Sequence, residues 1–123
     1  MTKLTKLLAV GSIALFSQFA LADAASAQKT IVDILAGMNH FPSDEQKAEL
    51  MSIAADENSG RGLQMVATAV SNIQHAPDAE GKASMEMLID YERASDDLKA
   101  LAAVVLGFNH MASDDAKAVL AGF

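Results

Sequence analysis

The sequence contains no cysteine and no tryptophan, and it has only two prolines, one tyrosine and five phenylalanines. Without cysteine the chain can form no disulfide, cannot be lipidated through a thiol, and offers neither a thiolate metal ligand nor a cysteine nucleophile. Because aromatic residues are so few, the core must consist of Ala, Leu, Ile, Val and Met. Such a core suits helices that approach each other closely.

Known catalytic motifs are absent as well. The sequence has no G-x-S-x-G elbow and no H-E-x-x-H helix, and the stretch from Gly60 to Gly62 is too short for a phosphate-binding loop. The acidic residues lie at expected helix starts and on expected solvent-facing surfaces, where solvated carboxylates are normal. We therefore predict that the protein is not an enzyme.

The first 22 residues have the pattern of a signal peptide. Lys3 and Lys6 precede an apolar run from Leu7 to Phe16, and small residues then offer a cleavage site after Ala22, with an alternative after Ala27. The whole apolar stretch is shorter than the roughly 20 residues that span a bilayer. We therefore expect an exported protein, periplasmic or secreted, with no stable membrane anchor after cleavage.

Basic residues are scarce in the remaining chain, residues 23–123. All 16 acidic residues lie there with only seven of the nine basic residues, which gives a net charge of −9. This charge argues against nucleic acid and against anionic membranes as partners. A chain of this length is expected to form a single domain.

A sequence repeat is the most informative positive feature. The three histidines, His40, His75 and His110, follow one another at intervals of 35 residues, and the 14-residue segments starting at Gly37 and Gly107 are identical at eight positions. A fixed period of this length is typical of repeat architectures, in which one supersecondary unit packs on its neighbours.

The segment before each histidine carries the same helical stripe of apolar residues. The stripe has the spacing i, i+3, i+4 and i+7, which places all four residues on one helix face. The three stripes are Ile31, Ile34, Leu35 and Met38; Val66, Ala69, Val70 and Ile73; and Leu101, Val104, Val105 and Phe108. We call the helix that carries this stripe helix A of each unit.

A second helix is expected after each histidine. Ser43, Asp78 and Ser113 are good N-cap residues, and Gln46 would complete a capping box with Ser43. Before the histidines, we expect each helix A to end near Ala36, Ser71 or Leu106, with the following Gly37, Asn72 or Gly107 in the left-handed conformation.

These signals predict an all-α protein of three tandem helical hairpins of about 35 residues, packed as a small bundle or short solenoid after the signal peptide. The expected unit boundaries are about 27–61, 62–96 and 97–123. The segment from Asp56 to Gly62 is a polar break between units, and Ser95 to Asp97 resembles another helix start.

The links between the paired helices hold the candidate binding residues. An amide residue precedes each histidine, and a lysine follows seven residues after it; these residues are Asn39, Gln74, Asn109, Lys47, Lys82 and Lys117. One interpretation is structural: the imidazoles and amides satisfy backbone groups left unpaired at the helix ends, and the lysines pair with Asp44, Asp78 and Asp114.

The alternative interpretation is a metal site. Three neutral imidazoles can bind Zn²⁺ or copper. In an open stack of hairpins, which we expect for so few units, equivalent atoms would lie about 10 Å or more apart, too far for one ion. Closure around a pseudo-threefold axis would instead bring His40, His75 and His110 together.

Methionine is a further soft ligand for copper. Met38 occupies a stripe position and Met85 an apolar position of the second helix in its unit, so both are expected in the core. Met87 and Met111 remain as candidate copper ligands.

The leading functional prediction is a non-catalytic binding module. Helical arrays usually bind through an extended face, here the row of links, and we expect a protein or peptide partner in the cell envelope or outside the cell. Metal binding or trafficking through the histidines is the alternative. We also expect that the chain can self-associate, because the short last unit would leave its second helix thinly covered.

Overall fold

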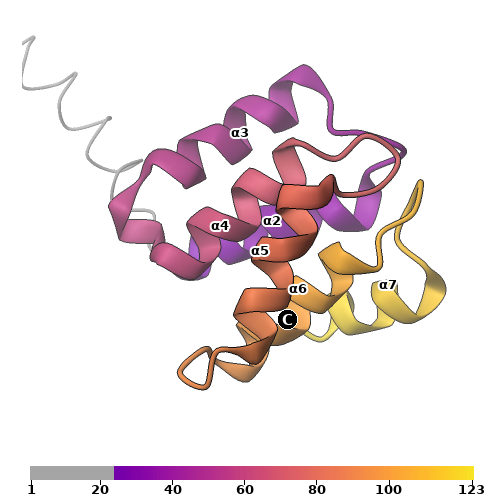
Figure 1. Ribbon diagram of the computed structural model, residues 1–123. Coiled ribbons are helices and arrows are strands. Elements are labelled where there is room, and N and C mark those ends of the chain that lie inside the picture. The colour runs from indigo at the N-terminus through magenta and orange to yellow at the C-terminus, as the bar shows by residue number, and fades with distance from the viewer. Residues whose placement is uncertain (1–23) are drawn as a thin grey trace, which may run out of the picture.

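The computed structural model describes residues 24–123, so the predicted signal peptide lies outside the described residues. This part of the chain is all-helical, as predicted, and contains no strand (Figure 1). None of its helices is long and apolar enough to cross a membrane. The elements are α2 (Ala24–Gly37), α3 (Asp44–Ala55), the short 3-10 helix η1 (Glu57–Ser59), α4 (Arg61–Ser71), α5 (Ala79–Asp90), α6 (Asp96–Leu106) and α7 (Asp114–Ala121).

The first helix of each pair supplies most of the core. All twelve residues of the three predicted stripes are buried, and Ile31, Val66 and Leu101 are completely inaccessible. Nine of them lie on α2, α4 and α6, and the last residue of each stripe lies just after its helix. The second helices contribute less: Leu50 is the one buried residue of α3, and Leu120 is the one buried residue of α7. The helix pairs are therefore arranged with α2, α4 and α6 inside and α3, α5 and α7 outside.

The helix starts follow the predicted caps. The Ser43 side chain accepts a hydrogen bond from the Gln46 N–H, and the Gln46 side chain accepts one from the Ser43 N–H, which completes the capping box. Asp78, Ser95 and Ser113 cap α5, α6 and α7 in the same way with one side-chain bond each. These bonds satisfy amides that a helix start leaves without partners.

The helix ends differ from the prediction in their conformation. Helices α4 and α6 end at Ser71 and Leu106 as expected, and α2 ends one residue later than expected, at Gly37. However, Asn72 and Gly107 have φ values of −97° and −90° and are not left-handed. The expected left-handed cap at this position is therefore wrong, and the left-handed residues lie three positions further along each link.

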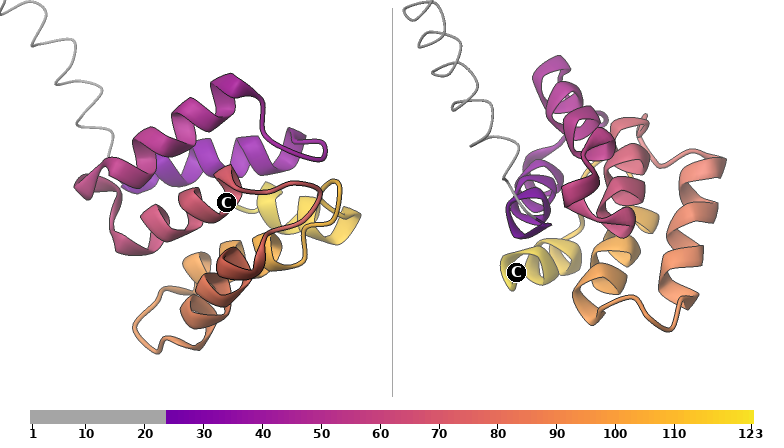
Figure 2. Two further views of the ribbon diagram at one scale, coloured as in Figure 1. Left: turned by 45° about the horizontal axis from the view of Figure 1, so that its top comes forward. Right: turned by 90° about the vertical axis from the view of Figure 1, so that its left-hand side faces the viewer.

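The three hairpins close on themselves. Helix α4 contacts α2, α3, α5 and α6, while α7 contacts both α6 and α2. Figure 2 shows α7 beside α2, so the last hairpin meets the first. An open solenoid would separate its two ends, and the expectation of an open stack is therefore wrong. Helix α7 nevertheless has Leu120 as its one buried residue and leaves Val119 exposed, so self-association stays a prediction.

One glycine allows the closest approach between inner helices. The predicted break from Asp56 to Gly62 is shorter than expected, because α4 already begins at Arg61 and Gly62 lies in its first turn. A Cβ atom on Gly62 would overlap with the Leu98 side chain of α6. The absence of a side chain at Gly62 therefore lets α4 and α6 pack closely.

Candidate metal centre

The three links meet at one end of the molecule, on the right-hand side of Figure 1. They bring the rings of His40, His75 and His110 together, with ring centroids 5.0 Å apart for His40–His75, 5.1 Å for His40–His110 and 5.0 Å for His75–His110. The near-equality of these distances gives the cluster a pseudo-threefold arrangement. The links thus form a single convergent cluster, and the extended row expected for an open array is absent.

A closed ring of backbone hydrogen bonds holds the three histidines in place. The His40 N–H donates to the His110 carbonyl (2.5 Å), the His75 N–H donates to the His40 carbonyl (2.6 Å), and the His110 N–H donates to the His75 carbonyl (2.5 Å). Each histidine therefore donates once and accepts once. Because the bonds involve only the backbone, the ring fixes the position of each Cα without using the imidazole.

The same three residues have an unfavourable backbone conformation. Their φ values are 65° at His40, 69° at His75 and 68° at His110, and no other non-glycine residue between 24 and 123 has a positive φ. At His40 and His110 the following N–H bonds back to the preceding carbonyl, at 2.6 Å and 2.7 Å, and closes a three-residue γ-type turn. A positive φ costs an L-residue about 1–2 kcal/mol.

The cluster has the dimensions of a metal site. One nitrogen from each ring can be chosen so that all three lie within 4.8 Å of one another. A triangle with sides no longer than 4.8 Å has a central point at most about 2.8 Å from each corner, against 2.0–2.1 Å in a Zn–imidazole bond. Shifts of about 0.7 Å per nitrogen would complete the coordination, which small rotations of exposed side chains can supply. All three histidines are exposed.

The imidazoles take little part in holding the links together. The His110 Nδ1 lies 2.7 Å from the Asn109 Oδ1, and within residues 24–123 the rings of His40 and His75 have no hydrogen bond to the protein. The structural role expected of the imidazoles at the helix ends is therefore wrong. Link N–H groups bond to the carbonyls at the ends of α4 and α6, and the cap side chains of Ser43, Asp78 and Ser113 satisfy the amides at the next helix starts. Two of the three rings thus have both nitrogens available.

The lysines and the methionines have separate outcomes. The predicted ion pairs are not formed by Lys47, Lys82 and Lys117. The ion pair found in the described chain joins Lys29 to Asp33.

The methionines expected in the core lie there: Met38 and Met85 are buried as predicted, whereas Met87 and Met111 are exposed. Met111 directly follows His110, and the exposed Phe41 occupies the same position after His40. No feature of the sequence pattern indicated that Phe41 lies on the surface beside the cluster.

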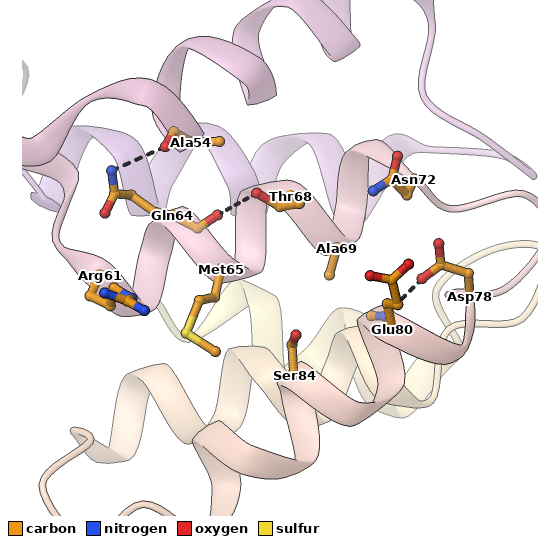
Figure 3. A pocket seen from close by; sticks show the side chains of 11 residues that line it. Ala54, Arg61, Gln64, Met65, Thr68, Ala69, Asn72, Asp78, Glu80 and Ser84 are labelled. Atoms are coloured by element: carbon orange, nitrogen blue, oxygen red, sulfur yellow. Dashed lines mark hydrogen bonds between the residues drawn. The ribbon is translucent and has the colours of Figure 1, made fainter.

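A groove between α4 and α5 is a weaker candidate. It encloses about 390 Å³ and is lined by Arg61 at one end and by Asp78 and Glu80 at the other (Figure 3). Three of its polar side chains are already engaged: Gln64 Nε2 donates to the Ala54 carbonyl, the Thr68 hydroxyl donates to the Gln64 carbonyl, and Asp78 accepts from the Gly81 N–H. None of the histidines lines it, so it is separate from the cluster.

Comparison of the chain with protein-family models, with curated proteins and with solved structures gives no match.

Proposed function

We propose that this protein is an exported, non-catalytic metal-binding module that holds one Zn²⁺ or copper ion with His40, His75 and His110. The observation that carries the proposal is the convergence of three imidazoles from links 35 residues apart, with nitrogens within 4.8 Å of one another. Neutral imidazole nitrogen is a good ligand for both metals.

The backbone conformation gives independent support. If the links needed only to close the ring of hydrogen bonds, glycine would adopt the positive φ at less cost than histidine. Histidine nevertheless occupies all three positions, at φ 65°, 69° and 68°. Strained residues that persist in this way are concentrated at functional sites, and the side chain they hold in place is the natural candidate for that function.

The surroundings of the cluster favour an exchangeable ion over a buried structural one. Metal-bound histidines usually donate their second nitrogen to a fixed acceptor, and loss of such an acceptor weakens binding about 10–100-fold. Of the three rings in the described chain, that of His110 alone has such a partner. Because all three rings are exposed, an ion bound here would also keep coordination positions open to solvent or to an external ligand.

Titration of the purified chain with Zn²⁺ and Cu²⁺, followed by calorimetry, tests the proposal. We expect one ion per chain and at least about tenfold weaker binding when any one histidine is replaced by glycine, the residue that best keeps the positive φ. Lys82→Ala, on the exposed surface of α5, is the matched control and should bind normally. The proposal fails if no ion binds, or if His75→Gly binds as tightly as the wild type.

A protein or peptide partner is the second candidate function, and two exposed apolar side chains favour it. Phe41 is 56% exposed and Met111 is 49% exposed, and each directly follows a histidine of the cluster. A partner that binds through these side chains should be retained when the histidines become glycine and lost in the double variant Phe41→Ser, Met111→Ser. The opposite pattern would assign the partner to the metal site, whose links contain Asn39, Gln74 and Asn109. The lysines predicted to share this surface, Lys47, Lys82 and Lys117, lie instead within α3, α5 and α7.

We further propose that the three hairpins are copies of one module and that the signal peptide is cleaved after Ala22. Two observations support three copies of one module. The φ values at the three histidines are nearly equal, and the N-caps lie at corresponding positions, Ser43, Asp78 and Ser113. For the signal peptide, cleavage after Ala27 would remove the first turn of α2, including Ala27 itself, which is 4% exposed. Mass spectrometry of the exported chain would distinguish the two sites.

A further inference from the structure

The side chain of Asn109 lies against the ring of His110, the histidine that follows it. We propose that Asn109 holds His110 in the tautomer with hydrogen on Nδ1, so that the lone pair for a metal is on Nε2, and that Asn39, which makes no such bond here, can hold His40 in the same way when it takes the rotamer of Asn109. The inference rests on the metal-binding function proposed above and assigns the geometry of that site.

One hydrogen bond sets the tautomer of His110. His110 Nδ1 lies 2.7 Å from Asn109 Oδ1. An amide oxygen can only accept a hydrogen bond, so the Nδ1 atom must carry the hydrogen. In a neutral imidazole the other nitrogen, Nε2, then has the lone pair, and the bond made by one ring nitrogen thus decides which nitrogen binds a metal.

The link at His40 can form the same bond. Asn39 is the same amino acid as Asn109, His40 has a φ of 65° against 68° at His110, and both links contain the γ-type turn in which the N–H after the histidine donates to the carbonyl before it. Because the two backbones match, the rotamer that Asn109 uses is also available to Asn39.

The link at His75 is different and provides a control. Its preceding residue is Gln74, which is one methylene longer than asparagine. The local backbone bond also runs in the opposite direction, from the Gln74 N–H to the Ala76 carbonyl at 3.2 Å. The Gln74 side chain therefore differs in length from that of Asn109, and its link lacks the γ-type turn that places the Asn109 amide against the neighbouring ring. We infer that His75 is not held in one tautomer.

Nitrogen-15 NMR of the imidazoles in the metal-free protein tests the tautomers directly. We expect His110 to carry its hydrogen on Nδ1 in the wild type, and to move toward the free-solution mixture, in which Nε2–H predominates, in Asn109→Ala. A wild-type His110 with its hydrogen mainly on Nε2 would overturn the inference. This readout needs no metal, so it stands even if the titrations disprove metal binding.

Metal titrations then test the consequence for the site. Asn109→Ala and Asn39→Ala should each weaken binding about tenfold, and Asn109→Asp should restore it, because a carboxylate also accepts from Nδ1–H. Gln74→Ala is the matched control and should change the affinity less than twofold. The inference fails if Gln74→Ala weakens binding as much as Asn109→Ala does. Urea unfolding of the metal-free variants should be unchanged, since the Asn109–His110 bond is exposed.

Discussion

Replacing all three histidines by glycine separates the backbone ring from the imidazoles that it carries. Glycine relieves a cost of about 1–2 kcal/mol at each positive φ. Its greater freedom in the unfolded chain opposes this by about 0.5–1 kcal/mol, and the exposed ring–ring contacts are lost. These effects nearly cancel, so we expect the metal-free triple variant to match the wild type to within about 1 kcal/mol per site.

With metal present the two proteins should differ. An ion at 100 times its dissociation constant stabilises the wild type by about 2.7 kcal/mol. For a domain of about 100 residues this corresponds to a rise in Tm of about 10–20 °C. The triple glycine variant should show no such rise. Thermal unfolding with Zn²⁺ and with a chelator measures both quantities in one experiment.

Alanine at the same positions provides the internal comparison. It also removes the imidazoles, but it has a Cβ atom and so keeps the cost of the positive φ. Each alanine should therefore lower the metal-free stability by about 1 kcal/mol relative to glycine. The reasoning is refuted if the glycine variant keeps the metal-dependent rise in Tm. It is also refuted if glycine costs more than about 3 kcal/mol without metal, because the imidazoles would then be structural.

Three further predictions concern pH and packing. Lowering the pH should weaken metal binding in titrations, because only a neutral imidazole nitrogen can bind the ion; an affinity that does not fall would exclude histidine ligands. Gly62→Val should destabilise the protein by about 1–3 kcal/mol in urea unfolding, because its side chain would overlap with Leu98, and adding Leu98→Ala should recover part of the loss. Leu50→Ala, at a fully buried position of α3, should cost about 2–5 kcal/mol; a smaller loss would mean that α3 packs loosely on the core.

The helix faces and helix starts could be predicted from the sequence because they depend on local periodicity and local hydrogen bonds. Apolar residues spaced by 3.6 can be buried together only on one helix face, and all twelve stripe residues are buried. Likewise, the capping box needs only Ser43 and Gln46 three positions apart. Neither feature depends on how the hairpins are arranged.

Closure of the three hairpins could not be predicted in the same way. A spacing of 35 residues is equally compatible with an open stack and a closed ring, since the difference lies in the contacts of α7 with α2. The left-handed position was assigned to Gly37, Asn72 and Gly107 because glycine and asparagine adopt it readily. The structure instead uses the histidines, where the hydrogen bonds between links offset the cost of the positive φ. That compensation arises only when all three links meet.

The ring of hydrogen bonds also limits how such a fold can evolve. Open helical arrays lengthen by duplication, because an added unit simply stacks on an exposed end. Here His40, His75 and His110 each use their one N–H and a carbonyl within the ring, so no donor is left over for a fourth link. A fourth hairpin could join only if one of the three bonds opened, and the larger ring would widen the space between the imidazoles.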